Sequence, residues 1–446
     1  MMNDIPTGLT SAQGLNLNAF EQISTSVQSW RNDNGTRVMF VETRGLPIVD
    51  IKLRFKAGTS ADQDHHGLAA VTLHMLDKGS DGLEAAERDR RMQELGAIVS
   101  KDIRLDHATF SLRTLSAPEI LTPAVTLLAS MLAHPDFPAD ALKTIKTRVN
   151  AQDGAWRKSQ HWQPVIELYH HLYQGHPYES VLSTPEHVDA LTVDDLKAFH
   201  RKAYCASNLD IAIVGDLSRE AAVALAQDIS SALPQGWTAA HLPPVPSSVA
   251  ATRHLPWSVP NILAQLTLPM NVPPTEAEHL PLQLANEVLG GGFSSRLMQE
   301  LRQRLELTYH IDSDFTASST AGRLSIRWDV KPQHLQTSVE RVDALLLALA
   351  QEGPTLEELQ LAQQRLAGKC LKEVATNGQL AERLAYLASH DLPDDYLDTY
   401  TDRLREQTPA VVHEVIRRRF DLDRKILITV GGPADQQPLA PSPSDQ

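Results

Sequence analysis

The chain contains an internal repeat, and this repeat limits its possible folds more than any other feature of its 446 residues. Residues 192–215, TVDDLKAFHRKAYCASNLDIAIVG, align without a gap with TPAVVHEVIRRRFDLDRKILITVG at 408–431. The same offset of 216 residues places AGTSADQDHHGLAAVTL at 57–73 on PPTEAEHLPLQLANEVL at 273–289. Two matches that share one offset are not expected by chance, so the sequence predicts two copies of one unit of domain size.

Each copy is expected to mix strands with long helices. In the first copy, turn residues and apolar runs predict strands at 27–31, 36–43, 48–56, 108–115 and 209–215. Helical periodicity predicts helices at 65–78, 83–95, 117–133, 138–155, onward to about 173, and from 192. Thr192 and its equivalent Thr408 are predicted N-caps. Turn-joined strands mixed with long helices are typical of an α+β fold with a largely antiparallel sheet.

A proline-rich segment separates the two copies. QGWTAAHLPPVPSSVAATRHLP, at 235–256, can continue neither a helix nor a central strand, so we expect a semi-rigid linker there. The first domain is then expected over 1–234 and the second over 257–432. The last residues, 433–446, have the composition of a disordered tail.

The charge balance excludes several classes of partner. The chain has 41 Lys and Arg against 55 Asp and Glu, which gives a net charge of −14 with neutral histidines. Such a surface repels phosphate backbones and anionic lipids, so no nucleic acid partner is expected. No apolar run reaches the ~18 residues that a membrane-spanning helix needs, so no membrane span is expected.

The two cysteines, Cys205 and Cys370, lie far apart and form no CxxC motif. This spacing argues against a disulfide scaffold and against a zinc site built from thiolates. Neither repeat symmetry nor spacing brings the two thiols together, so both are expected to be free.

Three segments resemble one family of peptidases. HHGLAAVTLHMLDKGS at 65–80 resembles the segment of M16 (pitrilysin- or insulinase-like) peptidases that carries the inverted zinc motif HxxEH. GHPYESVLSTPEHVDALTVDDLKAFHRKAY at 175–204 and GGGFSSRLMQELRQRLELTYHI at 290–311 also resemble that family, and the likeness covers about 27–432. It implies two homologous M16-type (LuxS/metallohydrolase-like) domains, each a mainly antiparallel sheet flanked by helices, joined by a linker. The repeat leads independently to the same organisation.

The zinc motif itself is degenerate in this chain. Alignment with the family places Ala70 at the first motif histidine, Leu73 at the glutamate and His74 at the second histidine. In HxxEH, two histidines one helical turn apart share a zinc ion, and the glutamate takes a proton from the metal-bound water. The third ligand of the family falls near Ala151 and Gln152. We therefore expect no zinc or other cofactor in this chain, and His74 is expected to be a half-buried residue with one hydrogen bond.

A second set of family residues is kept. Arg302 and Tyr309 are seven residues apart, about two turns if helical. By itself this pair is also typical of a solvated charge and a buried ring, but the resemblance implies substrate positioning and oxyanion stabilisation. The preceding Gly290, Gly291 and Gly292 are expected to form either a flexible helix end or a peptide-contacting loop. Arg296 is expected to pack against a helix end.

The strand near TRVMFVETR, at 36–44, is expected to be an edge of the first sheet. M16 peptidases hold extended substrates by adding them as a strand to a sheet edge. The alternative is an ordinary edge strand, protected from aggregation by Arg37, Glu42 and Arg44. The sequence leaves both interpretations open.

Together these features predict a zinc-less subunit of a two-component M16 peptidase. A partner chain of the same fold would carry HxxEH and the zinc ion, and this chain would supply Arg302 and Tyr309 for the cleavage of peptides or unfolded proteins. The alternative is a structural or peptide-binding homologue without a catalytic role. The N-terminal MMNDIPTGLTSAQG lacks the basic and apolar parts of a secretory signal. We therefore expect a bacterial periplasmic protein whose signal has been removed or, alternatively, a cytoplasmic protein.

Overall fold

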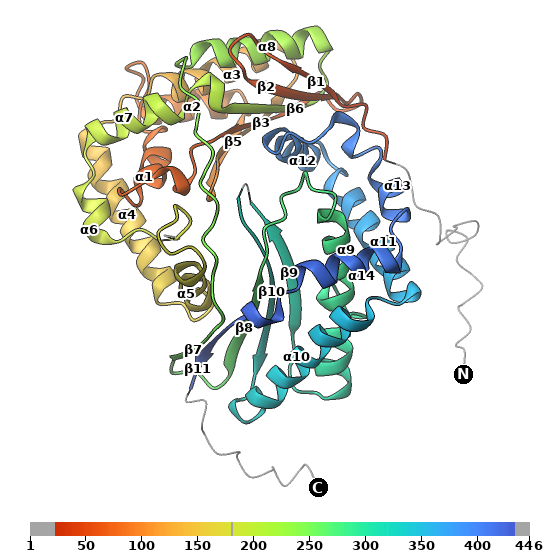
Figure 1. Cartoon of the computed structure of the whole chain (residues 1–446). Helices are drawn as coiled ribbons and strands as arrows, with labels where there is room; N and C mark the ends of the chain where they lie inside the picture. Colours follow the sequence, from red (N-terminus) through yellow and green to blue (C-terminus); the bar gives the residue numbers. More distant parts are fainter. Residues whose placement is uncertain (1–22, 180–181, 319, 433–446) are drawn as a thin grey trace, which may run out of the picture.

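The computed structural model of the chain describes residues 23–179, 182–318 and 320–432, and contains two β-sheets flanked by helices (Figure 1). The first sheet has six strands, in the spatial order β1 (Gln28–Arg31), β2 (Arg37–Glu42), β6 (Leu209–Gly215), β3 (Ile48–Phe55), β5 (Ala108–Leu115) and β4 (Ile98–Ile103). Only β2 and β6 pair in parallel. The tail expected over 433–446 lies outside the described residues.

The second sheet repeats this order without a counterpart of β1. Its strands are β7 (Ala251–Pro256), β11 (Ile426–Gly431), β8 (Ile262–Pro269), β10 (Gly322–Val330) and β9 (Ile311–Ala317). The parallel pair, β7 with β11, again lies at the same place in the order. The predicted α+β fold of two similar halves with mainly antiparallel sheets is therefore confirmed.

The helices also follow the repeat. Those of the first half are α1 (Leu68–Met75), α2 (Ala85–Glu94), α3 (Pro118–Ala133), α4 (Ala139–Arg157), α5 (Gln163–Leu172), α6 (Pro185–Ala190), α7 (Val193–Ala203) and α8 (Arg219–Ala232). Those of the second half are α9 (His279–Gly290), α10 (Leu335–Glu352), α11 (Leu356–Glu373), α12 (Asn377–Ser389), α13 (Tyr400–Arg405) and α14 (Pro409–Arg419). Thr192 accepts a hydrogen bond from the Asp195 amide and Thr408 from the Val411 amide, which confirms both predicted N-caps.

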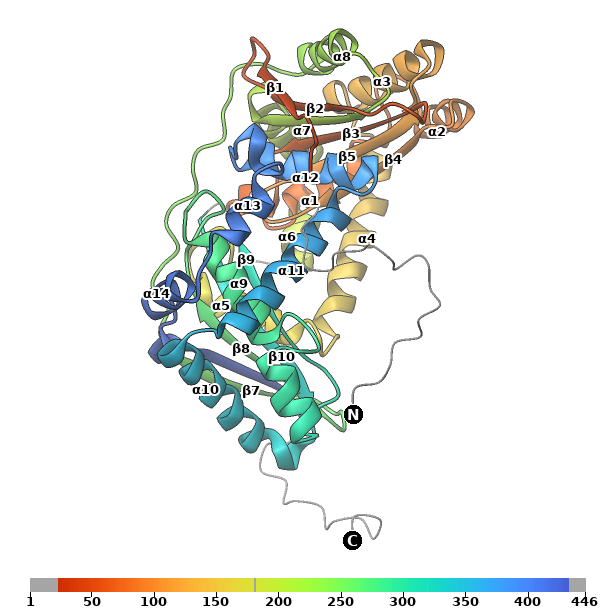
Figure 2. The same cartoon turned by 90° about the vertical axis from the view of Figure 1, so that its right-hand side faces the viewer.

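The two halves exchange one helix each. Helix α12 of the second half packs on β6, β3 and β2 of the first sheet, and α5 of the first half packs on β11 and β8 of the second sheet. Figures 1 and 2 show α12 beneath the first sheet, with α3 and α8 on the opposite face. The two helices are repeat equivalents, so the exchange is reciprocal.

The alternation of side chains along the central strands divides them between two cores. In β2 and β6, Val38, Phe40, Ile211 and Ile213 belong to the core of the first half. Their neighbours on the other face join the core that α12 shares with the rest of the second half; they are Met39, Val41, Ala212 and Val214. A strand such as LDIAIVG is buried on both faces, which explains its nearly continuous apolar sequence.

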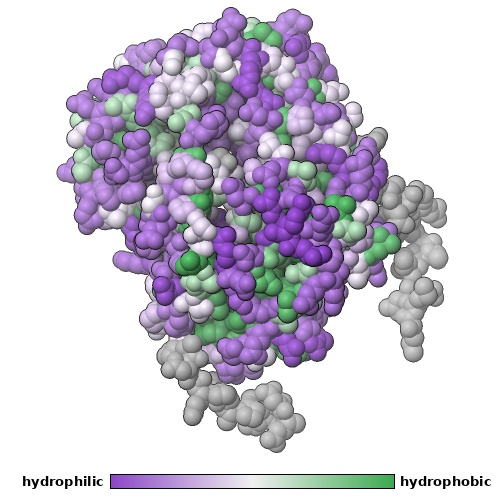
Figure 3. Space-filling model, in the orientation of Figure 1, coloured by the Kyte–Doolittle hydropathy of each residue, from purple (hydrophilic) through white to green (hydrophobic). Residues whose placement is uncertain are grey.

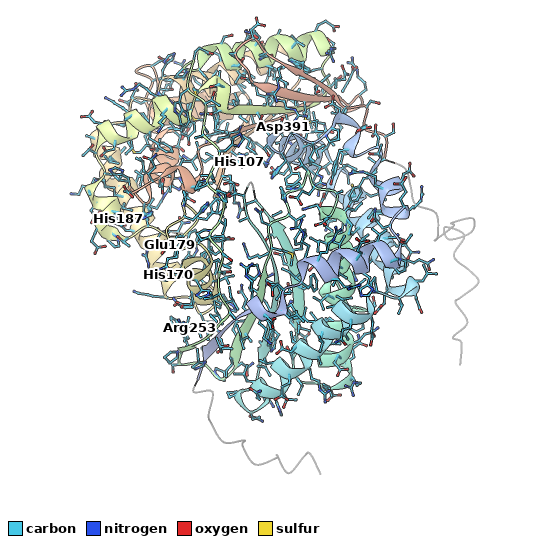
Figure 4. All side chains as sticks on the ribbon, in the orientation of Figure 1. His107, His170, Glu179, His187, Arg253 and Asp391 are labelled. Atoms are coloured by element: carbon cyan, nitrogen blue, oxygen red, sulfur yellow. The ribbon has the colours of Figure 1, made fainter. Side chains whose placement is uncertain are left out.

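Ion pairs fix the rim of the contact between α12 and the first sheet. Glu382 of α12 pairs with Lys52 at 2.9 Å and with Arg54 at 2.7 Å, both on β3. Just beyond the helix, Asp391 (labelled in Figure 4) pairs with Arg37 at 3.0 Å. Because these arginines and lysines are largely covered, the pairs help to fix the position of α12 along the strands.

The segment between the halves is only partly a linker. Residues 235–250 form neither helix nor strand, but the last six residues of the expected linker form strand β7 at the edge of the second sheet. The face of the molecule in Figure 3 is mostly hydrophilic, with small hydrophobic patches on its lower part. None of the helices in the described residues combines the length and the hydrophobicity that a bilayer crossing requires.

Candidate functional site

A cavity of about 730 Å³ lies where the degenerate zinc motif was expected. Its wall includes Ala70, Leu73 and His74 of α1 together with Gln152 of α4, so the structure brings these four residues to one place. Ala151 does not line the cavity, and Gln152 is therefore the residue at the expected third ligand position. Strand β4, helix α5 and the β9–β10 hairpin complete the wall, so both halves contribute to it.

The start of α1 is positioned by a buried carboxylate. Asp62 accepts hydrogen bonds from the amides of Gly67 and Ala69, each at 2.7 Å, and so satisfies two free N–H groups at the helix start. Gly67 has a φ of +95°, and a Cβ there would lie 2.8 Å from the Ser183 Cβ. Ser183 is held in turn by Asp153 of α4 through its amide at 2.9 Å. These contacts place the degenerate motif against α4.

His74 is a neutral residue in this site. Burial, together with the nearby positive charges of Lys101 and Arg148, lowers its pKa to about 4. Its Nδ1 atom is buried and finds no hydrogen-bond partner within residues 23–179, 182–318 and 320–432, so this atom does not make the hydrogen bond expected from the sequence.

A lysine that the sequence analysis missed lies beside the motif. Lys101, on β4, donates to the carbonyl oxygen of Leu73 at 3.2 Å and to Asp77 Oδ2 at 2.5 Å. Burial lowers its pKa to about 8, so the ammonium group is still mostly charged at neutral pH. A positive charge therefore stands next to the position where the family has its catalytic glutamate.

The site does not fit a zinc ion. Ala70 offers no donor atom, Leu73 offers no base, and the charge of Lys101 would oppose a cation beside His74. Within the described residues, no three His, Cys, Asp or Glu side chains gather as metal ligands. The thiols of Cys205 and Cys370 are free, buried, and located in different halves.

The rest of the cavity wall is aromatic and basic. The rings of Trp156 and Trp162 stack with their centroids 4.8 Å apart, at the end of α4 and just before α5. Tyr169 of α5 and Tyr173, just after that helix, follow along the wall, and Arg323 of β10 donates to the Tyr169 hydroxyl at 3.2 Å. His107, which also lines the cavity, lies between the two halves in Figure 4.

Arg302 and Tyr309 contact each other, but not because one helix carries both. Arg302 lies in a π-helical turn, η4 (Met298–Arg304), and the chain then reverses at Glu306, which has a φ of +51°. The Arg302 guanidinium lies 4.7 Å from the centre of the Tyr309 ring and 5.6 Å from that of Phe293. Both rings are exposed, Tyr309 at 78% and Phe293 at 62%. The alternative interpretation of the pair, in which Tyr309 is a buried ring, is therefore wrong.

This exposed group lies away from the cavity. Neither Arg302 nor Tyr309 lines it, whereas Thr316, on the same strand β9 that follows Tyr309, does. Six residues, most of them in β9, lie between Tyr309 and Thr316, and an extended chain of that length spans roughly 20 Å.

The glycine triplet is set by close packing. A Cβ on Gly290 would clash with Ser313, one on Gly291 with Glu287, and one on Gly292 with the Arg365 guanidinium. Glu287 is buried and pairs with Arg365 at 3.2 Å and with Lys369. Because they have no Cβ, the glycines allow the backbone to pack closely against Glu287 and Arg365. The next residue, Phe293, is exposed.

Arg296 contacts two helix ends. It binds both carboxylate oxygens of Glu358 at the start of α11, at 2.7 and 2.8 Å, and donates to the Gly353 carbonyl oxygen at 2.9 Å. Arg296 thus packs against helix ends, but these are the end of α10 and the start of α11 and not the glycine-bearing end of α9 that the sequence suggested.

The expected sheet edge was misplaced. Strand β2 lies inside the sheet, between β1 and β6, because residues 28–31 form a hairpin with it. The interpretation of 36–44 as an edge is wrong. Among the described strands, the edge beside the cavity is β4, which pairs with β5 alone and carries Lys101.

Two family models match the chain. The model described as "Insulinase (Peptidase family M16)" matches residues 37–186. The model described as "Peptidase M16 inactive domain" matches residues 190–366. The matches adjoin each other and cover parts of both halves.

Proteins of known sequence and structure resemble most of the chain. A crystal structure described as a peptidase M16 inactive domain from Pseudomonas fluorescens has 32% identity and a TM-score of 0.88, covering 93% of this chain and 100% of that one. The "non-peptidase homolog YmxG" of Helicobacter pylori is 23% identical over 86% of this chain and 89% of its own length. An "uncharacterized zinc protease YmxG" of Bacillus subtilis is 21% identical over 80% of this chain and 86% of its own.

Proposed function

Because this chain belongs to the M16 peptidase family, we propose that it is the zinc-less subunit of a two-component peptidase of that family. A partner chain of the same fold carries the intact HxxEH motif and its zinc ion. This chain contributes Arg302 and Tyr309, which bind the peptide substrate and stabilise the oxyanion formed during cleavage. Peptides or unfolded proteins are the substrates.

The position of the Arg302–Tyr309 pair is the observation that carries this proposal. The two side chains contact each other at the surface, and roughly 20 Å of chain, most of it strand β9, separates Tyr309 from the cavity-lining Thr316. A hydroxyl and a guanidinium that act on a developing oxyanion must lie within hydrogen-bonding distance of it. The pair is therefore suited to a site on another chain rather than to the cavity of its own.

The degenerate motif supports the same division of roles. Ala70 and Leu73 leave α1 without a metal ligand or a general base, and Lys101 adds a positive charge beside them. Such a site gives this chain no means of its own to activate water, so a zinc ion held by a partner is required.

Reconstitution tests the proposal. This chain and an HxxEH-bearing chain from the same organism are purified, and peptide cleavage is measured for each alone and for the mixture. We expect cleavage only in the mixture. Tyr309→Phe should lower kcat about 100-fold while leaving the affinity between the chains unchanged, because an oxyanion donor acts mainly in the transition state.

Arg304→Ala is the matched control. Arg304 lies two residues from Arg302 on the same turn, but it pairs with Glu300 instead of the aromatic rings. Its replacement should leave cleavage nearly unchanged. If Tyr309→Phe and Arg302→Ala mixtures cleave at the unaltered rate, the shared site does not exist.

The alternative function is that of a non-catalytic, peptide-binding homologue. Two observations favour it: both halves of this chain line the cavity, and the Helicobacter pylori relative is called a non-peptidase homolog. Peptide binding by the single chain, with no cleavage in any mixture, would support this alternative.

A further inference from the structure

One arginine in the cavity wall, Arg323, contacts a tyrosine instead of a carboxylate. Arg323 donates from Nη1 to the Tyr169 hydroxyl at 3.2 Å and lies 5.1 Å from the centre of that ring. Its Nε is buried and has no hydrogen-bond partner in the part of the chain that the structure describes. Among the described residues, no carboxylate forms an ion pair with Arg323, whereas Arg327 on the same strand pairs with Asp312 at 3.0 Å. A covered charge without a counter-ion is costly, because the protein replaces water without returning an opposite charge.

The acidic residues of the cavity wall are already engaged elsewhere. Asp62 binds two amides at the start of α1, and Asp153 binds Ser183. Asp102 pairs with Arg104 at 2.8 Å, and Asp106 accepts from the Tyr178 hydroxyl at 2.6 Å. The guanidinium of Arg323 therefore faces a cavity whose own carboxylates are occupied.

The remaining wall suits an apolar group. Trp156 and Trp162 stack on each other, and Tyr169 and Tyr173 meet edge to face with their ring centres 5.1 Å apart. A volume of about 730 Å³ falls within the range of pockets that hold small ligands or a few residues of peptide. Lys101 and Arg104 also line the cavity, but they pair with Asp77 and Asp102, whereas Arg323 contacts a tyrosine. Pockets with aromatic walls use a few placed polar groups of this kind to orient a ligand.

We propose that this cavity binds a carboxylate attached to an apolar or aromatic group. The carboxylate lies against the Arg323 guanidinium, and the apolar group lies against Trp156 and Trp162. A guanidinium is the side chain best shaped to bind a carboxylate through two parallel hydrogen bonds. The C-terminal residue of a peptide and a free aromatic acid share this chemistry. The site belongs to this chain alone and does not depend on a partner or on Arg302.

Titration calorimetry with three probes tests the proposal on the isolated full chain. The probes are N-acetyl-Ala-Ala-Phe as the free acid, the same peptide as its C-terminal amide, and N-acetylphenylalanine. We expect the free acid to bind at least tenfold more tightly than the amide, because only the acid carries a negative charge that can pair with the Arg323 guanidinium. Equal affinities of free acid and N-acetylphenylalanine would identify a small aromatic acid as the ligand; weaker binding of N-acetylphenylalanine would identify a peptide end.

Two variants assign the effect to Arg323. Arg323→Gln should abolish the difference between acid and amide. Arg327→Gln should preserve it, because that arginine lies on the same strand and already has an acidic partner. The proposal is overturned if acid and amide bind equally, if neither binds, or if Arg323→Gln binds the acid with unaltered affinity. Should Arg323→Gln fail to fold, the comparison of acid with amide on the unaltered chain still decides.

Discussion

At the scale of single residues, Lys101 changes what helix α1 can bind. Its ammonium group is fixed by the Leu73 carbonyl oxygen and by Asp77, so it cannot simply swing away from the motif. Lys78 also pairs with Asp77, at 3.0 Å, and so competes for the same negative charge. The degenerate motif thus lacks ligands and, in addition, carries a charge of the same sign as a metal ion.

This arrangement predicts that restoring the ligands is not enough to restore zinc binding. The triple variant Ala70→His, Leu73→Glu and Gln152→Glu returns the family residues around His74. We expect it to bind zinc weakly, because Lys101 repels the ion and pairs with the new glutamate. Adding Lys101→Ala should raise the zinc affinity at least tenfold, since a like charge ~4 Å away costs on the order of 1–4 kcal/mol.

Competition with a chromogenic chelator measures these affinities. Lys78→Ala in the triple variant is the control, because it leaves Lys101 in place and should change zinc affinity much less. An equally tight zinc site with and without Lys101 would show that the ligands alone decide binding.

The residues of the site were only partly predictable from sequence. The alignment with the family identified Ala70, Leu73 and His74, because the motif to which they correspond lies within one short segment, helix α1. It could not choose between Ala151 and Gln152, since a helix face is fixed only by what it packs against. Lys101 and Arg323 were missed, because they enter the cavity from strands of different halves and carry no local motif.

At the scale of single elements, α12 belongs to the second half in sequence but packs on the sheet of the first half. Leu384 is fully buried in the cluster that also contains Met39 and Val214 of the first sheet. Leu384→Ala should lower the free energy of unfolding by about 2–5 kcal/mol, because it leaves a cavity between a helix and the core around it.

Denaturant unfolding followed by both near- and far-ultraviolet circular dichroism measures this loss. Val411→Ala is the control, because Val411 is exposed at the start of α14 and should change stability by less than about 0.5 kcal/mol. A Leu384→Ala protein as stable as the unaltered chain would mean that α12 contributes little to the first sheet.

Element prediction succeeded where the signal was local. The repeated threonine caps and the apolar strands LDIAIVG and KILITVG could be predicted, because each pattern is contained in one segment. Strand β4 could not, because its residues are mostly exposed and show no alternation of burial. The edge position assigned to β2 was wrong. The strand at 27–31 was predicted, but no residue of β2 itself shows that β1 pairs with its outer side.

At the scale of the whole molecule, the exchange of α5 and α12 joins the halves into one folding unit. We predict that fragments 1–234 and 257–432, produced separately, will not be stable monomers. Each would expose the apolar sheet face that the helix of the other half covers. Size-exclusion chromatography and thermal unfolding of each fragment test this. A monomeric fragment with a cooperative transition near that of the full chain would show that each half is independent.

The exchange also has a consequence for synthesis on the ribosome. The first sheet is complete once Gly215 has left the ribosome, but the helix that covers its inner face ends only at Ser389. The difference, 389 − 215, is 174 residues, and at roughly 5–20 residues per second the nascent chain takes roughly 10 to 35 s to add them. During that interval the inner face of the first sheet lacks its cover, so this stretch of translation is when the protein most needs a chaperone.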